Sequence, residues 1–394
     1  MFKIKPIVIN IVLSVIALGL HAYLTQKFFD LQNGAASGQS LCNVGALWNC
    51  DAVSTSKYAQ IFGYPLALWA FSVHLVYIVT QIGLVFNLDS PSFWSASTRL
   101  GSVVIAAASV IMLAISLTQL KNYCLFCFLA YGISFLSLIL IHFSGLKLTG
   151  LFKDLPKLLS DKTSYGFLVS IPVLVLSLAS AWGGPFAESR VKEQIQDQIL
   201  AWKAAPEQSF DLSLGLHMGA PVETAKMVIV EFADFRCPHC KFAAPTLKAF
   251  TQSRDDVALL FKPFPLDGTC NPSPAFNGQG DGISCRLASA AFCSESLNQS
   301  GWAMTQMIFD KQEDFRQFSK IEQVDELLCQ LNSSTDCEKL KLCMSEEKTK
   351  TEIQKMAQEG LQANIRGTPA FFVNKKELGG GQYMPILQAV EKEL

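Results

Sequence analysis

Long apolar stretches without any charged side chain dominate the first half of this chain. A helix that crosses a lipid bilayer needs about 20 residues. Five such stretches predict five transmembrane helices, over Pro6–Gln26, Tyr58–Leu88, Leu100–Leu120, Asn122–Leu146 and Thr163–Ala187. The second stretch is too long for one helix. That helix is expected to begin near Gly63-Tyr64-Pro65, because proline is tolerated in a first helical turn.

The hydrophobic pattern changes after the last of these stretches. Residues 183–221 are polar, with amphipathic helical spacing over Val191–Trp202. This is typical of a linker that sets how far the following domain can reach from the membrane half. Met227–Phe235 then has the continuous apolar character of a buried strand, and Lys241–Phe250 follows as a helix. The second half is therefore expected to form a soluble α/β domain.

Composition and charge agree with this division between lipid and water. The chain has 394 residues, 50% of them hydrophobic and only 16% charged, against about 25% charged in an ordinary soluble domain. Residues 1–182 hold ten Lys/Arg and five Asp, while the remaining residues hold 22 basic and 28 acidic side chains. The two halves are thus predicted to lie in different solvents.

The basic residues predict the orientation in the membrane. They precede the first helix and crowd the loop before the fifth, which places both on the cytoplasmic side: Lys3, Lys5, Lys147, Lys153, Lys157 and Lys162. An odd number of helices then places everything after Gly183 outside, where disulfides persist. Met1–Leu24 could instead be a cleaved signal peptide, although its apolar part exceeds the usual length of about 7–15 residues.

Cys237 and Cys240 stand directly after the predicted strand, in the sequence Cys-Pro-His-Cys. A Cys-x-x-Cys between a strand and a helix is the thioredoxin arrangement. Unpaired N–H groups and the helix dipole stabilise a Cys237 thiolate there, and His239 adds a donor or a positive charge. Half a zinc site is the alternative. No second cysteine pair follows at zinc-finger spacing in this domain, so no metal is expected.

A second signal is Pro369, in Gly-Thr-Pro just ahead of an apolar strand. With it, residues 221–394 resemble a DsbA-type thioredoxin domain with helical sequence inserted. The resemblance implies that Pro369 is cis and faces the dithiol. It also makes Glu231, six residues before Cys237, a buried proton acceptor for Cys240. Taken by itself, Glu231 could also be a strand residue that faces water.

Six further cysteines lie in the same domain. An even number outside the cell indicates structural disulfides, and six cysteines allow about 15 connectivities. The expected bridges are Cys270–Cys285 across a Pro/Gly-rich loop, Cys329–Cys337 across residues 330–336, and Cys293–Cys343 as the remaining pair.

The membrane half carries two more cysteine pairs. Cys124, Cys127 and Tyr131 share one face of the fourth predicted helix, which suits a hydrophobic electron acceptor that approaches from within the bilayer. Cys42 and Cys50 lie eight residues apart in a polar loop. The alternative for Cys124 and Cys127 is a chance pair of buried small apolar residues.

These features resemble the vitamin K epoxide reductase family over about residues 5–145. The resemblance rests on the two loop cysteines, on Ser56 six residues after the second, on Gly63 opening the next helix, and on a membrane Cys-x-x-Cys followed by Tyr131. It implies that Tyr131 hydrogen-bonds a quinone carbonyl and that Ser56 helps to shape the site. Ser56 could alternatively cap a helix.

The same resemblance implies an order among the four membrane cysteines. Cys127 would meet the quinone, Cys124 would exchange with the loop through Cys50, and Cys42 would face the thioredoxin domain. The family's second polar quinone contact, on the second helix, has no evident counterpart. The histidines in or beside the spans, His21, His74 and His142, are expected to make interhelical hydrogen bonds.

The predicted fold class is multi-domain, with an all-α transmembrane bundle followed by an α/β thioredoxin-fold domain with a helical insertion. Residues 1–146 form the bundle, with a four-helix catalytic core. Residues 147–220 hold the cytoplasmic loop, a fifth linking helix and an outer linker. Residues 221–394 form the DsbA-like domain.

The chain looks like the bacterial fused homologues, which implies a quinone-dependent protein disulfide oxidoreductase of the inner membrane with its thioredoxin-like domain outside the cytoplasm. Electrons would pass from reduced exported proteins through three dithiols to ubiquinone, menaquinone or a similar quinone, in the order Cys237/Cys240, Cys42/Cys50 and Cys124/Cys127. No glycine-rich phosphate motif occurs, so neither a nucleotide nor nucleic acid is expected.

Two other functions remain open at this point. A quinol-driven reductase or isomerase would run the same path backwards, but DsbA, which shares the Cys-Pro-His-Cys arrangement, is a strong oxidant. A non-enzymatic membrane receptor or scaffold with an outer binding domain is the alternative of another class. Three intact dithiols argue against it.

Overall fold

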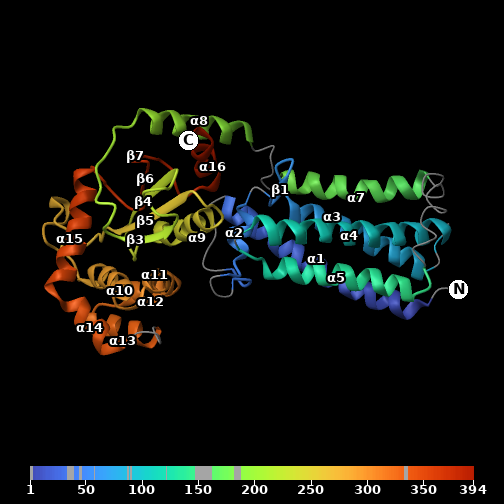
Figure 1. The fold of residues 1–394 in the computed structure, drawn as a ribbon, viewed down its shortest axis with the longest axis horizontal. Coiled ribbons are helices and arrows are strands. Elements are labelled where there is room, and N and C mark those ends of the chain that lie inside the picture. Colours follow the sequence, from blue (N-terminus) through green and yellow to red (C-terminus); the bar gives the residue numbers. More distant parts are fainter. Residues whose placement is uncertain are drawn as a thin grey trace. The chain divides into compact units, whose positions relative to one another are not determined.

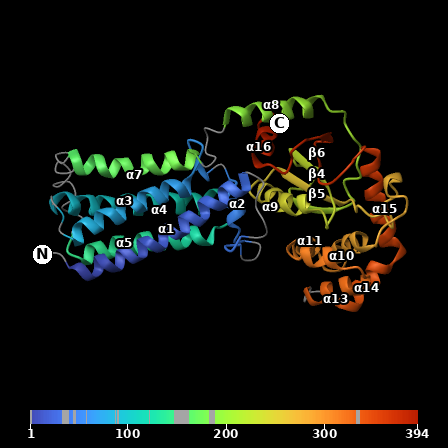
Figure 2. The same ribbon diagram turned by 180° about the vertical axis from the view of Figure 1, so that it is seen from behind.

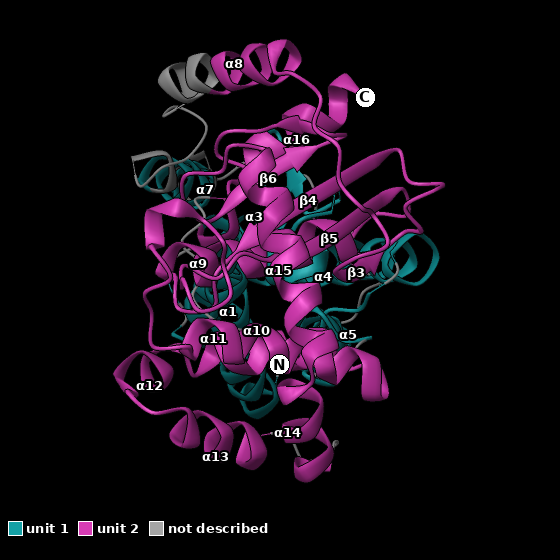
Figure 3. Ribbon diagram, turned by 90° about the vertical axis from the view of Figure 1, so that its left-hand side faces the viewer, with its two compact units in different colours: residues 1–29, 40–192 teal, residues 30–39, 193–394 magenta. Residues whose placement is uncertain are grey.

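The computed structural model describes residues 3–32, 40–43, 47–56, 58–86, 88, 91–120, 122–146, 162–181, 188–331 and 336–394. Internal contacts divide the chain into two compact units, which Figure 3 colours separately. Residues 1–29 and 40–192 form the membrane unit, and residues 30–39 and 193–394 form the thioredoxin unit.

The membrane unit is a bundle of long helices that run side by side in Figures 1 and 2. Among the described residues, four helices are long and apolar enough to cross a membrane: α1 (Ile4–Gln32), α3 (Leu66–Val85), α4 (Pro91–Gln119) and α5 (Leu125–Phe143). The fifth predicted span forms α7 (Lys162–Ala181), which is apolar over residues 166–178, where its side chains are described. The predicted all-α bundle is therefore confirmed.

The starts of two helices show how local sequence sets their bounds. Pro65, with extended backbone, is the N-cap of α3, close to the predicted start. The charge-free stretch predicts that the next helix starts at Leu100, but α4 begins at Pro91 and includes Arg99. That prediction was wrong because proline is tolerated in a first turn and one charged residue does not end a helix.

A buried polar cluster joins three helices of the bundle. The Nδ2 of Asn10 in α1 donates to the hydroxyl of Tyr77 in α3 at 2.7 Å, and the Ser137 hydroxyl in α5 donates to Asn10 Oδ1. Gly101 of α4 lies against this cluster, because a Cβ there would be 2.7 Å from the Tyr77 ring. In an apolar bundle such hydrogen bonds and close approaches fix the helices relative to one another.

Short elements form the described part of the outer loop. Helix α2 (Cys50–Ser54) is followed by two strands, β1 (Gln60–Ile61) and β2 (Tyr64–Pro65), which pair as a tight antiparallel ladder. Phe62 and Gly63 between them both have positive φ, 53° and 79°. Glycine adopts such a φ without a steric penalty, which explains why Gly63 suits the turn before α3.

The thioredoxin unit is built on a five-stranded sheet with the order β3-β5-β4-β6-β7. The strands are β3 (Leu216–Gly219), β4 (Met227–Ala233), β5 (Val257–Pro263), β6 (Ala370–Val373) and β7 (Lys376–Glu377). β4 and β5 are parallel and are connected by α9 (Pro238–Gln252), while the other neighbours are antiparallel. The predicted α/β thioredoxin fold is confirmed.

The helical insertion lies between β5 and β6, and Figure 1 shows it in orange. It contains η3 (Pro274–Phe276), α10 (Ile283–Asn298), α11 (Gly301–Asp310), α12 (Gln312–Gln317), α13 (Ile321–Leu331), α14 (Cys337–Ser345) and α15 (Glu347–Gln362). Its described disulfides are Cys270–Cys285, Cys293–Cys343 and Cys329–Cys337. These are the three pairings selected from the sequence.

Alternation along β4 gives the sheet two apolar faces. Ile229 packs with residues of α9 and α16 (Met384–Glu393) on one face. Val230 and Phe232 pack with Ala357 of α15 on the other. Because side chains of a strand alternate, Glu231 shares the face of Ile229, toward α9.

The segment expected to be a flexible linker is folded instead. Helix α8 (Glu188–Ala204) lays Ile199 and Trp202, 8% and 6% exposed, into the core that contains Ile229. The Trp202 indole N–H donates to the Val373 carbonyl oxygen at 3.0 Å. The amphipathic spacing was recognised, but its apolar face belongs to the thioredoxin unit, which begins well before residue 221.

We predict that Trp202→Ala lowers the free energy of unfolding of the protein by about 3–5 kcal/mol, the usual cost of deleting a buried Trp. Denaturant unfolding followed by circular dichroism measures this loss. Leu200→Ala is the matched control, because Leu200 lies on the same helix and is 59% exposed. Equal effects of the two substitutions would contradict the docking of α8.

Candidate active site

Cys237 and Cys240 lie where the chain passes from β4 into α9. Cys237 is the N-cap of α9, and both side chains are buried free thiols. A hydrogen bond from the Cys240 thiol is the main cause that lowers the pKa of Cys237 to about 5, and the backbone N–H groups of Cys240 and His239 add to it. Burial raises the pKa of Cys240 well above its usual value. Near neutral pH, Cys237 is a thiolate and Cys240 a thiol.

The segment around Pro369 meets this dithiol. The Thr368–Pro369 peptide bond is cis, and in its protonated form the Cys237 thiol donates a hydrogen bond to the Thr368 carbonyl oxygen at 3.2 Å. The ring of His239 is exposed. The structure therefore assigns part of the effect on Cys237 to the backbone of His239 rather than to its ring.

Glu231 is buried beside the dithiol. It is 1% exposed, and its Oε1 has no hydrogen-bond partner. Burial, and then the negative charge of Cys237, raise the pKa of Glu231 to about 8. Glu231 in turn contributes to the raised pKa of Cys240. The alternative that Glu231 faces water is wrong, because its position in β4 points it toward α9.

Asp234 is a buried carboxyl group near the dithiol, and no motif in the sequence marks it. It accepts hydrogen bonds from the backbone N–H groups of Arg236 at 2.6 Å and Leu266 at 2.7 Å. Burial raises the pKa of Asp234, and these hydrogen bonds act in the opposite direction. Asp234 thus connects the residues before Cys237 to the loop after β5.

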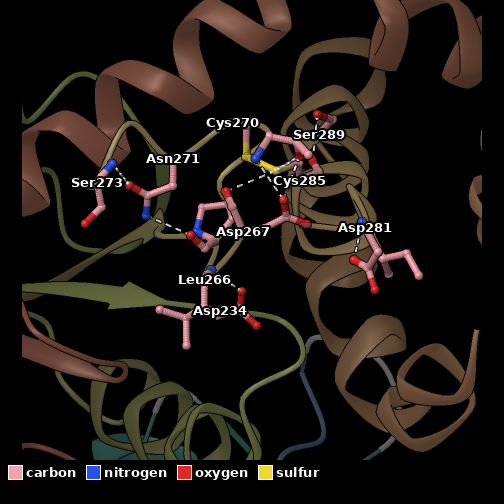
Figure 4. Close-up of a disulfide and its surroundings, with 12 residues drawn as sticks. Asp234, Leu266, Asp267, Cys270, Asn271, Ser273, Asp281, Cys285 and Ser289 are labelled. Atoms are coloured by element: carbon pink, nitrogen blue, oxygen red, sulfur yellow. Dashed lines mark hydrogen bonds between the residues drawn. A yellow bond between two sulfur atoms is a disulfide. The ribbon is translucent and has the colours of Figure 1, made fainter. Parts of the chain in front are cut away.

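The Cys270–Cys285 disulfide closes that loop, and Figure 4 shows it together with Asp234. Asp281 lies in the same loop and forms an ion pair with Arg236 at 2.7 Å. It also accepts a hydrogen bond from the N–H of Ile283 at 3.1 Å, where α10 begins. The bridge therefore restrains the groups that hold the segment directly before Cys237.

Gln312 is a second residue that the sequence did not reveal. It is fully buried at the start of α12, and its Nε2 donates to the carbonyl oxygens of Phe235 at 2.8 Å and Cys237 at 3.0 Å. Gln312 thereby fixes the turn between β4 and α9. No pattern marks it, because it lies 75 residues from Cys237 within the helical insertion.

In the membrane unit, hydrogen bonds to one carboxylate organise the outer loop around the Cys42–Cys50 disulfide. Asp51 accepts from the Ser40 hydroxyl and, at 2.7 Å, from Asn43 Nδ2. The Asn43 side-chain oxygen accepts from the Cys50 N–H at 2.7 Å. Asp51 is 6% exposed, so these bonds hold the loop from inside.

The loop backbone also pairs with the segment that precedes α5. The Asn49 N–H donates to the Tyr123 carbonyl oxygen, and the Tyr123 N–H donates to the Leu47 carbonyl oxygen, both at 2.9 Å. Asn49 is in addition the N-cap of α2 and accepts from the Ala52 N–H at 3.0 Å. This pairing places the residue after Asn49 near the residue after Tyr123, and both are cysteines.

The second membrane disulfide is Cys124–Cys127 at the start of α5. Cys124 is the N-cap, with the Cys127 N–H donating to its sulfur at 3.1 Å. Cys124 packs in one apolar cluster with Cys42, Cys50 and Leu24, and Cys127 lies against that cluster. The two membrane disulfides are thus neighbours in a largely water-free environment.

An apolar cavity of about 240 Å³ opens beside Cys127, lined by α1, α3, α4, α5 and the end of the outer loop. Tyr131 and Ser56 both line it. Tyr131 hydrogen-bonds Ser116, and the Ser56 hydroxyl donates to a backbone carbonyl at 2.8 Å. Small-molecule sites usually occupy about 300–1,000 Å³. This cavity is therefore somewhat smaller than a typical small-molecule site.

Two of the three membrane histidines also line this cavity, which the sequence did not indicate. The His21 and His74 rings lie with centroids 4.9 Å apart. The expected interhelical hydrogen bonds are wrong for both: His74 Nδ1 lies 2.9 Å from the Ala70 carbonyl oxygen of its own helix, and His21 Nε2 has no partner. Among the described residues, no group of three or more His, Cys, Asp or Glu side chains is arranged so that it could hold a metal ion.

Two neighbouring disulfides beside an apolar cavity, and a thioredoxin-fold dithiol with one activated thiol, define a disulfide oxidoreductase of the membrane. Residues 8–142 match the model of the vitamin K epoxide reductase family, and residues 214–389 match a model described as thioredoxin. The chain therefore joins a domain that matches the vitamin K epoxide reductase family to a thioredoxin-like domain, and its apolar helices make it an integral membrane protein.

Individual relatives cover about half of the chain. It is 27% identical over 184 residues to disulfide bond formation protein D of Bacillus subtilis (strain 168), covering 45% of this chain and 78% of that protein. The oxidised BdbD structure from Bacillus subtilis is 21% identical to this chain, with a TM-score of 0.40. The match covers 48% of this chain and 97% of the BdbD chain. The catalytic domain of Proteus mirabilis ScsC is 23% identical, with a TM-score of 0.36. That match covers 46% of this chain and 89% of the ScsC chain.

We predict that alkylation of Cys237 in the fully reduced protein titrates with a midpoint near pH 5. The depressed pKa stabilises the folded reduced protein. This stabilisation is fully present above about pH 9, the usual pKa of the thiol, and is lost as the pH falls through 5. Iodoacetamide labelling read by mass spectrometry measures the midpoint.

The Cys240 hydrogen bond supplies the control for this titration. Cys240→Ala removes the donor and should raise the midpoint, whereas Cys240→Ser retains a donor and should keep it near that of the wild type. An unchanged midpoint in Cys240→Ala would show that Cys240 does not activate Cys237.

Proposed function

We propose that this protein forms disulfide bonds in exported proteins and passes the electrons to a membrane quinone. The observation that carries the proposal lies in the membrane unit. Cys127 lines an apolar cavity, and its partner Cys124 packs in one cluster with both cysteines of the outer loop. A path for electrons from the loop to a lipid-soluble acceptor requires this arrangement.

The proposed path consists of thiol–disulfide exchanges through mixed disulfides. A substrate thiolate attacks Cys237 in its disulfide with Cys240, and a second substrate thiol completes the new bond. The reduced pair then opens the Cys42–Cys50 disulfide. Each exchange moves two electrons and two protons from one dithiol to the next.

The membrane steps follow from the same exchange chemistry. The reduced outer loop opens the Cys124–Cys127 disulfide through Cys50 and Cys124. The dithiol so formed returns to a disulfide when two electrons and two protons convert the quinone to quinol. In this proposal the quinone is a substrate that leaves as quinol, with Tyr131 as a hydrogen-bond donor and Ser56 in the cavity wall.

Three residues around the first dithiol have supporting roles in the proposal. Glu231 accepts the proton of Cys240 when Cys240 attacks a mixed disulfide, and its raised pKa of about 8 suits reversible protonation near neutral pH. Pro369 holds the backbone against Cys237. The exposed ring of His239 meets incoming substrate.

The activation of Cys237 favours oxidation of substrates over the reverse path. A stabilised thiolate stabilises the reduced enzyme, and a dithiol whose reduced form is stable is a strong oxidant in its disulfide form. The low pKa of Cys237 therefore speaks against a quinol-driven reductase or isomerase. A pure scaffold would need neither this activated thiol nor the cavity beside Cys127.

Localisation follows from the charge distribution. Basic residues before the first span and before α7 favour a cytoplasmic position for both, and we infer that the thioredoxin unit lies on the extracytoplasmic side of a bacterial inner membrane. All three dithiols would thereby face or border an oxidising compartment.

We predict that Cys127→Ala abolishes quinone reduction while the disulfide of Cys237 and Cys240 still oxidises one equivalent of substrate. The first dithiol is untouched by the substitution, but its electrons have no exit. Absorbance of the quinone and the thiol count of a reduced unfolded substrate measure the two reactions. Continued turnover in this variant would remove Cys127 from the mechanism.

The transfer between the units can be trapped. In a Cys240→Ala/Cys50→Ala variant, the resolving thiol and the loop partner are both absent. When a mild thiol oxidant such as diamide takes up the two electrons and two protons of these thiols, a disulfide between Cys237 and Cys42 should therefore accumulate and appear on a non-reducing gel as a species that reductant abolishes. Adding Cys42→Ala is the matched control and should eliminate the species.

The position of the trapped cysteine decides the order of the path. Capture of Cys237 on Cys124 would mean that the outer loop is bypassed. The experiment also tests how the units reach one another. Helix α8 begins at Glu188, so a large part of the segment expected from the sequence to be a flexible linker is helical.

A further inference from the structure

His21 and His74 form a pair of buried rings in the wall of the cavity beside Cys127. They come from different helices, α1 and α3, and are 8% and 5% exposed. Their centroids lie 4.9 Å apart with the planes tilted by 46°. Neither residue has a role in the disulfide path described above.

The hydrogen bonding of the pair leaves one polar atom without a partner. His74 Nδ1 lies 2.9 Å from the Ala70 carbonyl oxygen. A carbonyl only accepts, so this nitrogen carries the hydrogen and the His74 tautomer is fixed. His21 Nε2, by contrast, is buried and has no hydrogen-bond partner. A buried polar group without a partner costs about 1–3 kcal/mol, which a ligand in the cavity would recover.

Several other polar groups of the cavity wall are already engaged in hydrogen bonds. Ser56 and Ser134 donate to backbone carbonyl oxygens of their own segments at 2.8 Å, and Trp69 Nε1 donates to the Ile61 carbonyl oxygen at 3.3 Å. His21 therefore differs from these neighbours, because its Nε2 is available to a group that enters the cavity.

A quinone presents two carbonyl oxygens, and each gains negative charge as electrons arrive and takes up a proton. A hydrogen-bond donor aimed at each oxygen stabilises that charge. Tyr131, one helical turn from Cys127, can serve one oxygen. For the other oxygen, the sequence alone identifies no hydrogen-bond partner on the second helix. In the structure, the cavity wall offers His21 of α1, with the His74 ring of α3 packed against it.

We propose that His21 is the second polar contact of the quinone and its proton donor, positioned by His74. This rests on the proposed function. His21 Nε2–H hydrogen-bonds one carbonyl oxygen and gives it a proton as the quinone is reduced, while Tyr131 serves the other oxygen.

The reduction of the quinone by the dithiol balances in protons and electrons. The dithiol of Cys124 and Cys127 loses two electrons and two protons and becomes a disulfide. The quinone gains two electrons and two protons and becomes quinol. One thiol proton reaches His21 as its Nε2 proton leaves, so no imidazolate forms and the imidazole carries the same number of protons before and after the cycle. The other thiol proton goes to the second quinone oxygen.

Binding of quinone to the oxidised protein tests the contact without turnover. A short-chain ubiquinone and a short-chain menaquinone are used as probes, and their dissociation constants are measured by equilibrium dialysis in detergent. His21→Leu should weaken binding of at least one probe about tenfold, the loss expected for one buried hydrogen bond. His142→Leu is the matched control, because His142 is exposed and lies in the same bundle.

Proton donation is separated from binding by a second variant. His21→Gln retains an N–H donor but cannot transfer a proton, so its dissociation constant should stay within about threefold of the wild type. The rate of quinone reduction should nevertheless fall about 100-fold, as expected for loss of a general acid. A normal rate in His21→Gln would overturn proton donation by His21.

The positioning role of His74 has its own readout. His74→Phe retains a ring against His21 and should preserve quinone binding, whereas His74→Ala should weaken it. Equal binding by these two variants would overturn the positioning role. Labelling that shows intact Cys42–Cys50 and Cys124–Cys127 disulfides verifies that each variant is folded.

The outcomes separate the inference from the function on which it rests. If the wild type reduces quinone and His21→Leu binds and reduces it equally well, the assignment of His21 is overturned. Equal losses in His21→Leu and His142→Leu would also overturn it, because a general disturbance of the bundle explains both. A wild type that neither binds nor reduces either probe would contradict the proposed function itself.

Discussion

The backbone of Leu47 and Asn49 pairs with Tyr123 through two hydrogen bonds of 2.9 Å, and the geometry of the membrane unit depends on this contact. It aligns the end of the outer loop with the segment that enters α5. The next residue on each side, Cys50 and Cys124, then enters one apolar cluster. A loop held only by its own disulfide would have no fixed position relative to α5, and sulfur atoms on the two segments would meet rarely.

Burial has opposite consequences for the groups around the thioredoxin-fold dithiol. Cys240 and Glu231 are held in their neutral forms, because the apolar surroundings penalise charge. Cys237 is nearly as buried, yet donors aimed at its sulfur outweigh that penalty. The site therefore holds one negative charge at one chosen atom. Asp234 and Gln312 contribute by fixing the backbone on either side of the turn, and not by touching the sulfur.

The sequence predicted features whose cause is local. Charge-free stretches located the spans because lipid excludes charge over the whole length of a helix. The Cys-x-x-Cys pairs were recognisable because their chemistry needs a short spacing. The bounds of α4 were missed because one arginine interrupts an otherwise helical sequence. The role of α8 was missed because an amphipathic pattern shows that one face is buried but not which surface covers it.

Long-range contacts escaped prediction for a similar reason. His21 and His74 were each treated as a lone histidine, since nothing in either segment shows that α1 and α3 bring their rings together. Gln312 resembles any polar residue of a surface helix until the fold places it under Cys237. Glu231 was the exception, because the resemblance carried by the neighbouring motif pointed to burial.

The three disulfides of the helical insertion have a consequence for the folding of each newly synthesised chain. Half of the twelve cysteines serve these bridges, and each such bond typically contributes about 2–4 kcal/mol to stability. A newly synthesised chain begins with all of them as thiols, so an oxidant must act before the unit that carries Cys237 is complete. If mature copies of the protein supply that oxidation, the protein is one of its own substrates. The rate at which new copies mature then depends on how many mature copies the membrane already holds.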